Sequence, residues 1–202
     1  MPYTRQQAPL AHNKIDAIDT TPNPPDSPFE HFTLCWMAFN DIYGIVTRQA
    51  LSNVPNANRQ LRTEQRQLAR VRPLFTQQLK DNILGHAAFR FFLNRVPRWN
   101  GQPVPADANG VTPNGVINLN ESHYSANLVF ASIDRPSYRA WAALPQAGAS
   151  CEALIDQILQ VLYTVRCNTI HGGKDTTDDN AIEVVNNAYA LVRMIVDSFL
   201  TR

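Results

Sequence analysis

One stretch of the chain, residues 28–50, constrains the fold more than any other because large apolar side chains recur there along a single helix face. They are separated by 3, 4, 3, 4 and 3 residues: Phe29, Phe32, Trp36, Phe39, Tyr43 and Val46. An α-helix brings residues three and four apart onto one side, so this spacing predicts an amphipathic helix. Such a helix buries its aromatic face only against other elements, which the rest of the chain must supply.

Further helical segments follow along the chain. The pattern of apolar residues, caps and breakers predicts helices near 57–72, 74–95, 135–144, 150–170 and 181–200. We find no internal repeat and no series of strands, and expect only a short strand near 116–119. The sequence therefore predicts an all-α fold, a bundle of about five or six helices.

Two segments lack any helical or alternating period. Residues 1–27 carry many prolines among polar residues, which predicts an extended N-terminal arm. Residues 97–120 combine proline, glycine and asparagine with almost no charge, which predicts a long loop. We interpret 28–202 as a single helical domain into which this loop is inserted.

Composition limits the compartment and the partners. The 202 residues, 44% of them hydrophobic, can form one core, and no apolar run reaches the length of a membrane span. The three cysteines (Cys35, Cys151 and Cys167) are scattered, which favours a reducing compartment. We therefore expect a cytoplasmic protein without membrane contact. The net charge of +1 gives no overall attraction to nucleic acid.

The predicted helix at 150–170 carries a charge in an unusual place. Arg166 lies four residues after Leu162, on the apolar stripe of that helix. Because an unpaired buried guanidinium is costly, Arg166 must pair with an acid, lie at an interface, or border a cleft that binds an anion. Asn168, His171 and Lys174 follow, so an amide, a titratable base and a second cation are close by in the chain.

The segment from Arg166 to His171 resembles the Arg-x4-His motif of HEPN domains, which are helical domains of prokaryotic toxin and antiviral ribonucleases. Residues 36–43 resemble the first helix of the larger stand-alone HEPN proteins, and residues 171–174 resemble the exit from their catalytic helix. The resemblance implies a metal-independent endoribonuclease that cleaves single-stranded RNA and needs no cofactor. It also implies a homodimer with a composite active-site cleft, and a toxin or antiviral role with a cognate antitoxin or inhibitor.

The resemblance also implies roles for individual residues. His171 would act as general base or acid, Arg166 would stabilise the transition state, and Asn168 would position the reacting groups. This agrees with the chemistry, because attack by the 2′-hydroxyl needs a proton acceptor that titrates near neutral pH and a cation at the phosphorane. Lys174 would hold a flanking phosphate, or else be an ordinary solvated lysine.

A row of arginines in the predicted second helix is a further candidate for RNA contact. Arg59, Arg62, Arg66 and Arg70 are separated by 3, 4 and 4 residues and so share one helix face. Arginine on one face can neutralise backbone phosphates, and we select Arg62 and Arg66 as substrate-binding residues. A merely solvated face is the alternative.

Two rival interpretations belong to other classes of protein. His31 and Cys35 are four residues apart, as are Cys167 and His171, so two facing helices could supply a zinc site. We favour no metal, with Cys35 packing as a small apolar residue. The other rival is a non-catalytic HEPN-like dimer that binds RNA, nucleotides or proteins, in which Arg166 and His171 are only structural.

Overall fold

The fold is described from a computed structural model of the chain. It covers residues 2–20, 28–52, 64–94, 98–99, 102–103, 115–116, 131–133, 135–143, 148–171, 177 and 179–201. Side chains at 65, 98–99, 102–103, 115–116, 131–132, 148–150, 171 and 180 are outside this description. The predicted loop at 97–120 is therefore described only at its short strands, and the strand expected near 116–119 is present in part.

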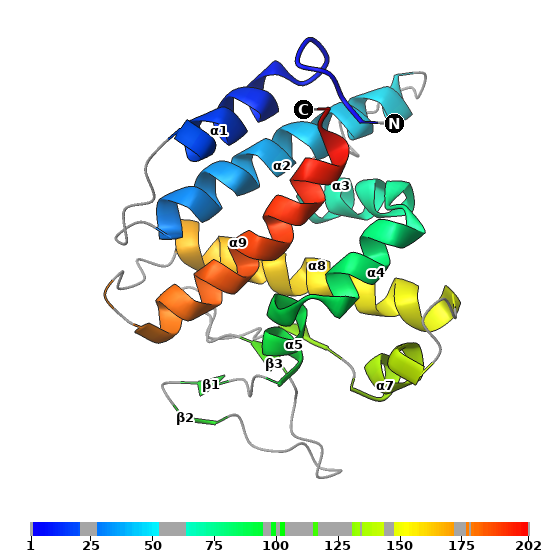
Figure 1. Cartoon of the computed structure of the whole chain (residues 1–202), viewed down its shortest axis with the longest axis vertical. Coiled ribbons are helices and arrows are strands. Elements are labelled where there is room, and N and C mark those ends of the chain that lie inside the picture. The colour runs from blue at the N-terminus through cyan, green and yellow to red at the C-terminus, as the bar shows by residue number, and fades with distance from the viewer. Residues whose placement is uncertain are drawn as a thin grey trace.

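The fold is all-α, as the sequence predicts (Figure 1). The helices are α1 (Pro9–Thr20), α2 (Pro28–Leu51), α3 (Glu64–Val71), α4 (Gln77–Gly85), α5 (Ala87–Asn94), α7 (Arg135–Ala143), α8 (Gly148–His171) and α9 (Asp179–Phe199), with a 3-10 turn η2 (Arg72–Leu74) after α3. Two antiparallel pairs of two-residue strands accompany them: β1 (Arg98–Trp99) with β2 (Gln102–Pro103), and β3 (Gly115–Val116) with β4 (Ala131–Ser132).

The aromatic face of α2 forms the centre of the core. It packs most extensively against α9, with α1, α3 and α8 as further neighbours. Phe39 is fully buried and makes edge-to-face contacts with Trp36 and Tyr43, with ring centroids 5.6 and 5.3 Å apart. Aromatic pairs favour this geometry. The helix that the 3-4 spacing predicts is thus confirmed, and it is the element on which the others pack.

The N-terminal segment is a correction to the sequence analysis. Residues 9–20, predicted as part of an extended arm, form α1, which packs along α2 (Figure 1). Ala8, Ala11, Ile15 and Ile18 are buried and are spaced as one helix face, and Pro9 begins the helix, where its missing N–H costs nothing. The surrounding prolines obscured this period.

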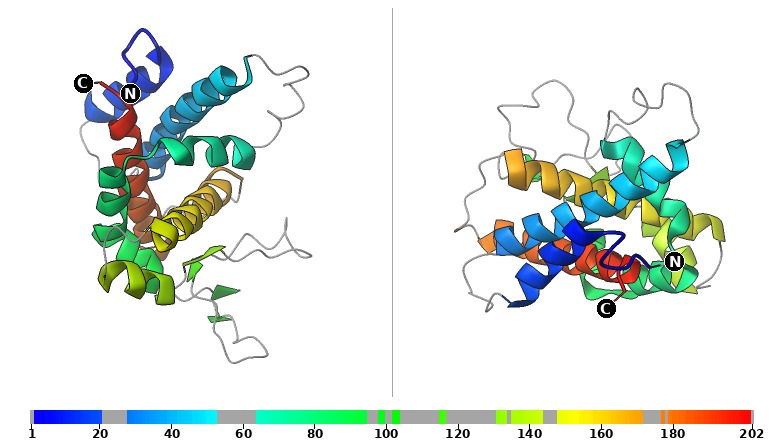
Figure 2. Two further views of the ribbon diagram at one scale, coloured as in Figure 1. Left: turned by 90° about the vertical axis from the view of Figure 1, so that its right-hand side faces the viewer. Right: turned by 90° about the horizontal axis from the view of Figure 1, so that it is seen from above.

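The two ends of the chain lie together (Figure 2). The Tyr3 amide donates a hydrogen bond to the carbonyl of Phe199 (2.6 Å), and the Thr201 amide donates to the carbonyl of Tyr3 (3.0 Å). His12 of α1 is buried, and its Nε2 lies 3.1 Å from the same Tyr3 carbonyl. The first residues are therefore fastened to the end of α9.

The segment predicted as one helix over 74–95 is two helices. Thr76 caps α4, its hydroxyl accepting from the amide of Leu79 (3.2 Å), and α4 ends at Gly85. His86 has an extended backbone, and α5 starts at the next residue. This division and α1 account for the difference between the predicted number of helices and the eight α-helices within the described ranges.

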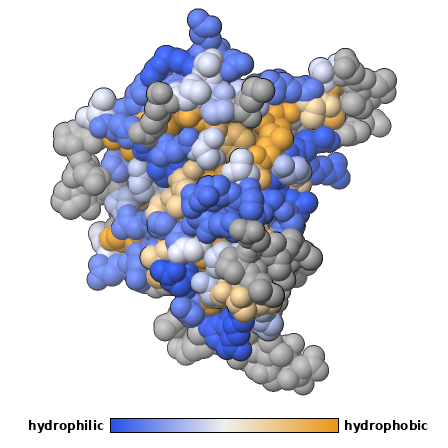
Figure 3. Space-filling view, turned by 45° about the vertical axis from the view of Figure 1, so that its right-hand side comes forward, coloured by the Kyte–Doolittle hydropathy of each residue, from blue (hydrophilic) through white to orange (hydrophobic). Residues whose placement is uncertain are grey.

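The surface is mixed in character. Figure 3 shows hydrophobic residues on one face bordered by hydrophilic ones. Of the large apolar side chains in the described ranges, Leu10, Met37, Leu74 and Ile170 are exposed. No described helix combines the length and the apolar character that crossing a membrane requires.

Candidate functional site

Arg166 is paired with an acid. Its Nη2 lies 3.4 Å from Oε2 of Glu64, and the two side chains are only 18% and 17% exposed. Arg166 is near the end of α8 and Glu64 is the first residue of α3. Of the three outcomes that the sequence leaves open for this charge, the structure thus shows a carboxylate partner supplied by another helix.

Glu64 is held in turn by the aromatic face of α2. Its Oε1 accepts hydrogen bonds from Trp36 Nε1 (2.9 Å) and from the Tyr43 hydroxyl (2.5 Å). Both donors are buried in the core. Burial, reinforced by the hydrogen bond to Glu64, raises the pKa of Tyr43. The Glu64 carboxylate on α3 therefore accepts hydrogen bonds from α2 and forms an ion pair with α8.

Tyr163 and Cys167 lie near Arg166 at the same end of α8. Burial raises the pKa of Tyr163 to about 12, and contact with Cys167 and the charge of Glu64 act in the same direction. The Cys167 Sγ lies 4.0 Å from Arg166 Nη1. Glu64 and Tyr163 were not selected from the sequence as site residues. Tyr163 stands three residues before Arg166 on one helix, a spacing that could have singled it out.

Asn168 lies on the opposite side of α8 from Arg166. It is 2% exposed and faces the interior of the bundle. Two residues along an α-helix correspond to a rotation of about 200°, so these two side chains point to opposite sides of α8. Any contribution of Asn168 within one chain is therefore made from inside the core.

The other predicted site residues are described in part or not at all. His171 is the last residue of α8, but its side chain lies outside the description. Lys174 and Arg62 are outside the described residues. Arg66 is exposed on α3.

His31, Cys35 and Cys167, the candidate zinc residues whose side chains are described, do not form a metal cluster. Within the described residues, no three His, Cys, Asp or Glu side chains are grouped so that they could hold a metal ion. Cys35 is completely buried, and its burial raises the pKa of the thiol. His31, on the same helix, packs against the ring of Tyr189, with centroids 6.0 Å apart. These two side chains are accounted for by packing against α9.

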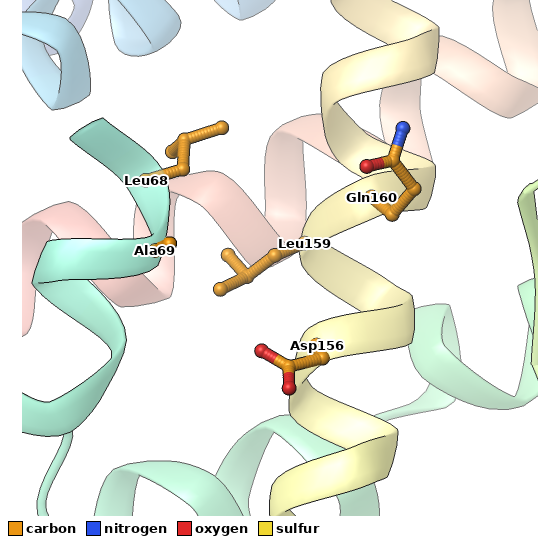
Figure 4. A pocket seen from close by; sticks show the side chains of 5 residues that line it. All are labelled: Leu68, Ala69, Asp156, Leu159 and Gln160. Atoms are coloured by element: carbon orange, nitrogen blue, oxygen red, sulfur yellow. The ribbon is translucent and has the colours of Figure 1, made fainter. Parts of the chain in front are cut away.

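A groove separates α3 from α8 (Figure 4). Its volume is about 190 Å³, and it is lined by Leu68, Ala69, Asp156, Leu159 and Gln160. Arg72 of η2 forms an ion pair with Asp156, one of the lining residues, and the Arg72 Nε lies 4.0 Å from a carboxylate oxygen of Glu152. Ion pairs therefore join α8 to α3 through Glu64 and to η2 through Arg72.

The end of α8 presents a cation, the Arg166 guanidinium, that an ion pair with Glu64 holds in place. A guanidinium carries five N–H donors and can bind a carboxylate and a phosphate together. Glu64 offsets part of the positive charge of Arg166 and fixes its position. Comparison with protein-family models, with curated proteins and with solved structures finds no match to this chain.

Proposed function

We propose that this protein is a metal-independent endoribonuclease of the HEPN type that cleaves single-stranded RNA in the cytoplasm. The observation that carries the proposal is the position of Arg166, which Glu64 holds at the end of the same helix whose last residue is His171. Five residues along a helix span about 7.5 Å, so a fixed cation and a titratable base belong to one helix end. The Arg-x4-His spacing and the all-α fold agree with the proposal.

The proposed reaction is an internal transesterification. His171 accepts the proton of the ribose 2′-hydroxyl while the 2′-oxygen attacks the adjacent phosphorus. The bond from phosphorus to the 5′-oxygen breaks, and the leaving oxygen takes up a proton from the protonated His171, which returns to its neutral form. The products are a 2′,3′-cyclic phosphate and a 5′-hydroxyl. Arg166 stabilises the negative charge of the phosphorane, and a cation that is already held in place does so at little reorganisation cost.

The proposal includes a homodimer. Arg166 stands beside the exposed Ile170 at the end of α8, and a second protomer there would enclose a cleft with two guanidinium groups. RNA is the substrate, and Lys174, Arg62 and Arg66 contact its phosphates. A prokaryotic toxin or antiviral effector of this kind has a cognate antitoxin or inhibitor as its partner.

The test is cleavage of a labelled single-stranded RNA by the purified protein in EDTA. We expect fragments that end in a 2′,3′-cyclic phosphate. Arg166→Ala and His171→Ala should reduce cleavage by at least about 100-fold, whereas Arg139→Ala, which removes an exposed arginine on α7, should retain it. Absence of cleavage by the intact protein would contradict the proposal, as would activity that EDTA abolishes and zinc restores.

The Glu64–Arg166 pair also favours a second candidate, a non-catalytic helical module in which Arg166 is structural. Trp36 and Tyr43 bind the same carboxylate, as expected for a polar group that joins three helices. Under this alternative the intact protein cleaves no RNA, and Arg166→Ala and Glu64→Gln lower the stability of the fold alike. Circular dichroism of each variant beside the cleavage assay separates the two candidates.

A further inference from the structure

The groove between α3 and α8 is mainly apolar but has two polar groups on one side. Leu68 of α3 and Leu159 of α8 extend into the space between the two helices, each only 5% exposed, and Ala69 lies beside Leu68 (Figure 4). Asp156 and Gln160 line it from α8, one turn apart. A space of about 190 Å³ is smaller than an ordinary pocket for a drug-sized ligand and has room for one small ring system.

The lining groups match the edges and faces of a nucleobase. Leu68 and Leu159 belong to the hydrophobic core, so they form an apolar floor of the groove on which one face of a planar heterocycle can lie out of contact with water. The Gln160 amide both donates and accepts hydrogen bonds, whereas the Asp156 carboxylate only accepts them. Arg72 holds Asp156 through Oδ2, and the carboxylate has a second oxygen that can accept from a ring amino group.

The groove and the Arg166 ion pair follow one another along the same seam. Leu159 and Arg166 are seven residues apart, so they share a face of α8 at a separation of about 10.5 Å along its axis. Glu64 and Leu68 are four residues apart on α3 and share a face in the same way. A nucleotide with its phosphate at Arg166 would therefore direct its own base, or the neighbouring one, along the seam toward the groove.

We propose that this groove binds a nucleobase that carries an exocyclic amino group, beside the phosphate held by Arg166. The inference rests on the proposed ribonuclease function and names the part of the RNA that this site would recognise. Asp156 accepts a hydrogen bond from the amino group, and Gln160 contacts the remaining edge. Adenine, cytosine and guanine meet this requirement. Uracil lacks the amino group and binds less well.

Binding can be measured without any cleavage. The methyl signals of Leu68 and Leu159 are followed by NMR while AMP, CMP, GMP, UMP or ribose 5-phosphate is added to the full-length protein. We expect the two leucines to respond to the amino-bearing nucleotides, with dissociation constants about fivefold lower than for UMP, the effect of one hydrogen bond. No response, or an equal response to ribose 5-phosphate, would overturn the proposal.

A variant that fills the groove provides the matched comparison. Ala69 is exposed on α3, so Ala69→Phe places a ring in the groove without displacing core atoms. Ala153→Phe adds the same ring to an exposed position of α8 that does not line the groove. Ala69→Phe should abolish the methyl shifts and Ala153→Phe should keep them. Equal nucleotide binding by both variants would overturn the proposal.

Cleavage products separate this proposal from the proposed function. If the protein cleaves RNA, we expect a preference for sites next to amino-bearing bases that Ala69→Phe removes and Ala153→Phe retains. Cleavage with the same base preference in both variants would support the ribonuclease function but contradict base binding in the groove. If the methyl signals of Leu68 and Leu159 shift in a base-dependent way but the protein cleaves no RNA, base binding in the groove is supported and the ribonuclease function is contradicted.

Discussion

The Arg166 guanidinium near the end of α8 lies 3.4 Å from the Glu64 carboxylate at the start of α3. Each side chain is more than four-fifths buried, so each is needed to compensate the other's charge. Removing Arg166 leaves Glu64 with two neutral donors, Trp36 and Tyr43, in place of a cation.

The first prediction concerns this coupling. Arg166→Met should lower the free energy of unfolding by about 2 kcal/mol, because it leaves a carboxylate largely buried without its cation. The double variant Arg166→Met with Glu64→Gln should recover at least about 1 kcal/mol relative to the sum of the single changes. Urea denaturation of the four proteins measures the cycle. If the changes in unfolding free energy are strictly additive, the interaction between Arg166 and Glu64 contributes nothing to stability.

The second prediction concerns alkaline pH. Burial raises the pKa of Tyr163 from the ordinary 10.0 to about 12, so the folded state disfavours the phenolate. The stabilisation from this group is fully present below pH 10 and disappears as the pH rises through 12. Tyr163→Phe should therefore show a smaller decrease in stability than the unmodified protein between about pH 9.5 and 11.5. Urea denaturation across this range measures it, and parallel pH profiles would contradict it.

The third prediction concerns the arginines at the start of the second predicted helix. Replacing Arg62 and Arg66 by Gln should weaken binding of single-stranded RNA and reduce its salt dependence by about 0.7 in the log–log slope for each phosphate that is no longer neutralised. Arg90→Gln, a change at an exposed arginine of α5, serves as the control. Fluorescence anisotropy at several salt concentrations gives the slopes. If the slope of the double variant matches that of the control, Arg62 and Arg66 belong to a solvated face.

The fourth prediction concerns the composite cleft. Sedimentation should give about twice the chain mass of 22.7 kDa. If each site combines Arg166 of one protomer with His171 of the other, mixing inactive Arg166→Ala and His171→Ala proteins should restore about a quarter of the activity, because half of the dimers are mixed and carry one intact site. The mixture is refolded together and assayed for RNA cleavage. A mixture as inactive as its components would place both residues within one chain.

Local periodicity predicted those helices whose buried faces are continuous. In α2, nearly every third or fourth residue is large and apolar, so one amphipathic pattern accounted for the whole helix. The pattern failed in α1, where the buried alanines and isoleucines are small or few and prolines lie on both sides. It also joined α4 to α5, because the extended backbone at His86 interrupts the helix without interrupting the apolar residues.

The sequence by itself determined the all-α class, the amphipathic aromatic helix over residues 28–50 and the presence of a charge on an apolar stripe at Arg166. These follow from side-chain spacing and from the cost of burying a charge, which are properties of one helix. Only the tertiary structure decided that Glu64 is the partner of Arg166, that Trp36 and Tyr43 support it, and that a groove follows the ion pair. The ion pair joins the start of α3 to the end of α8, and it depends on how both helices pack against α2, which no local pattern contains.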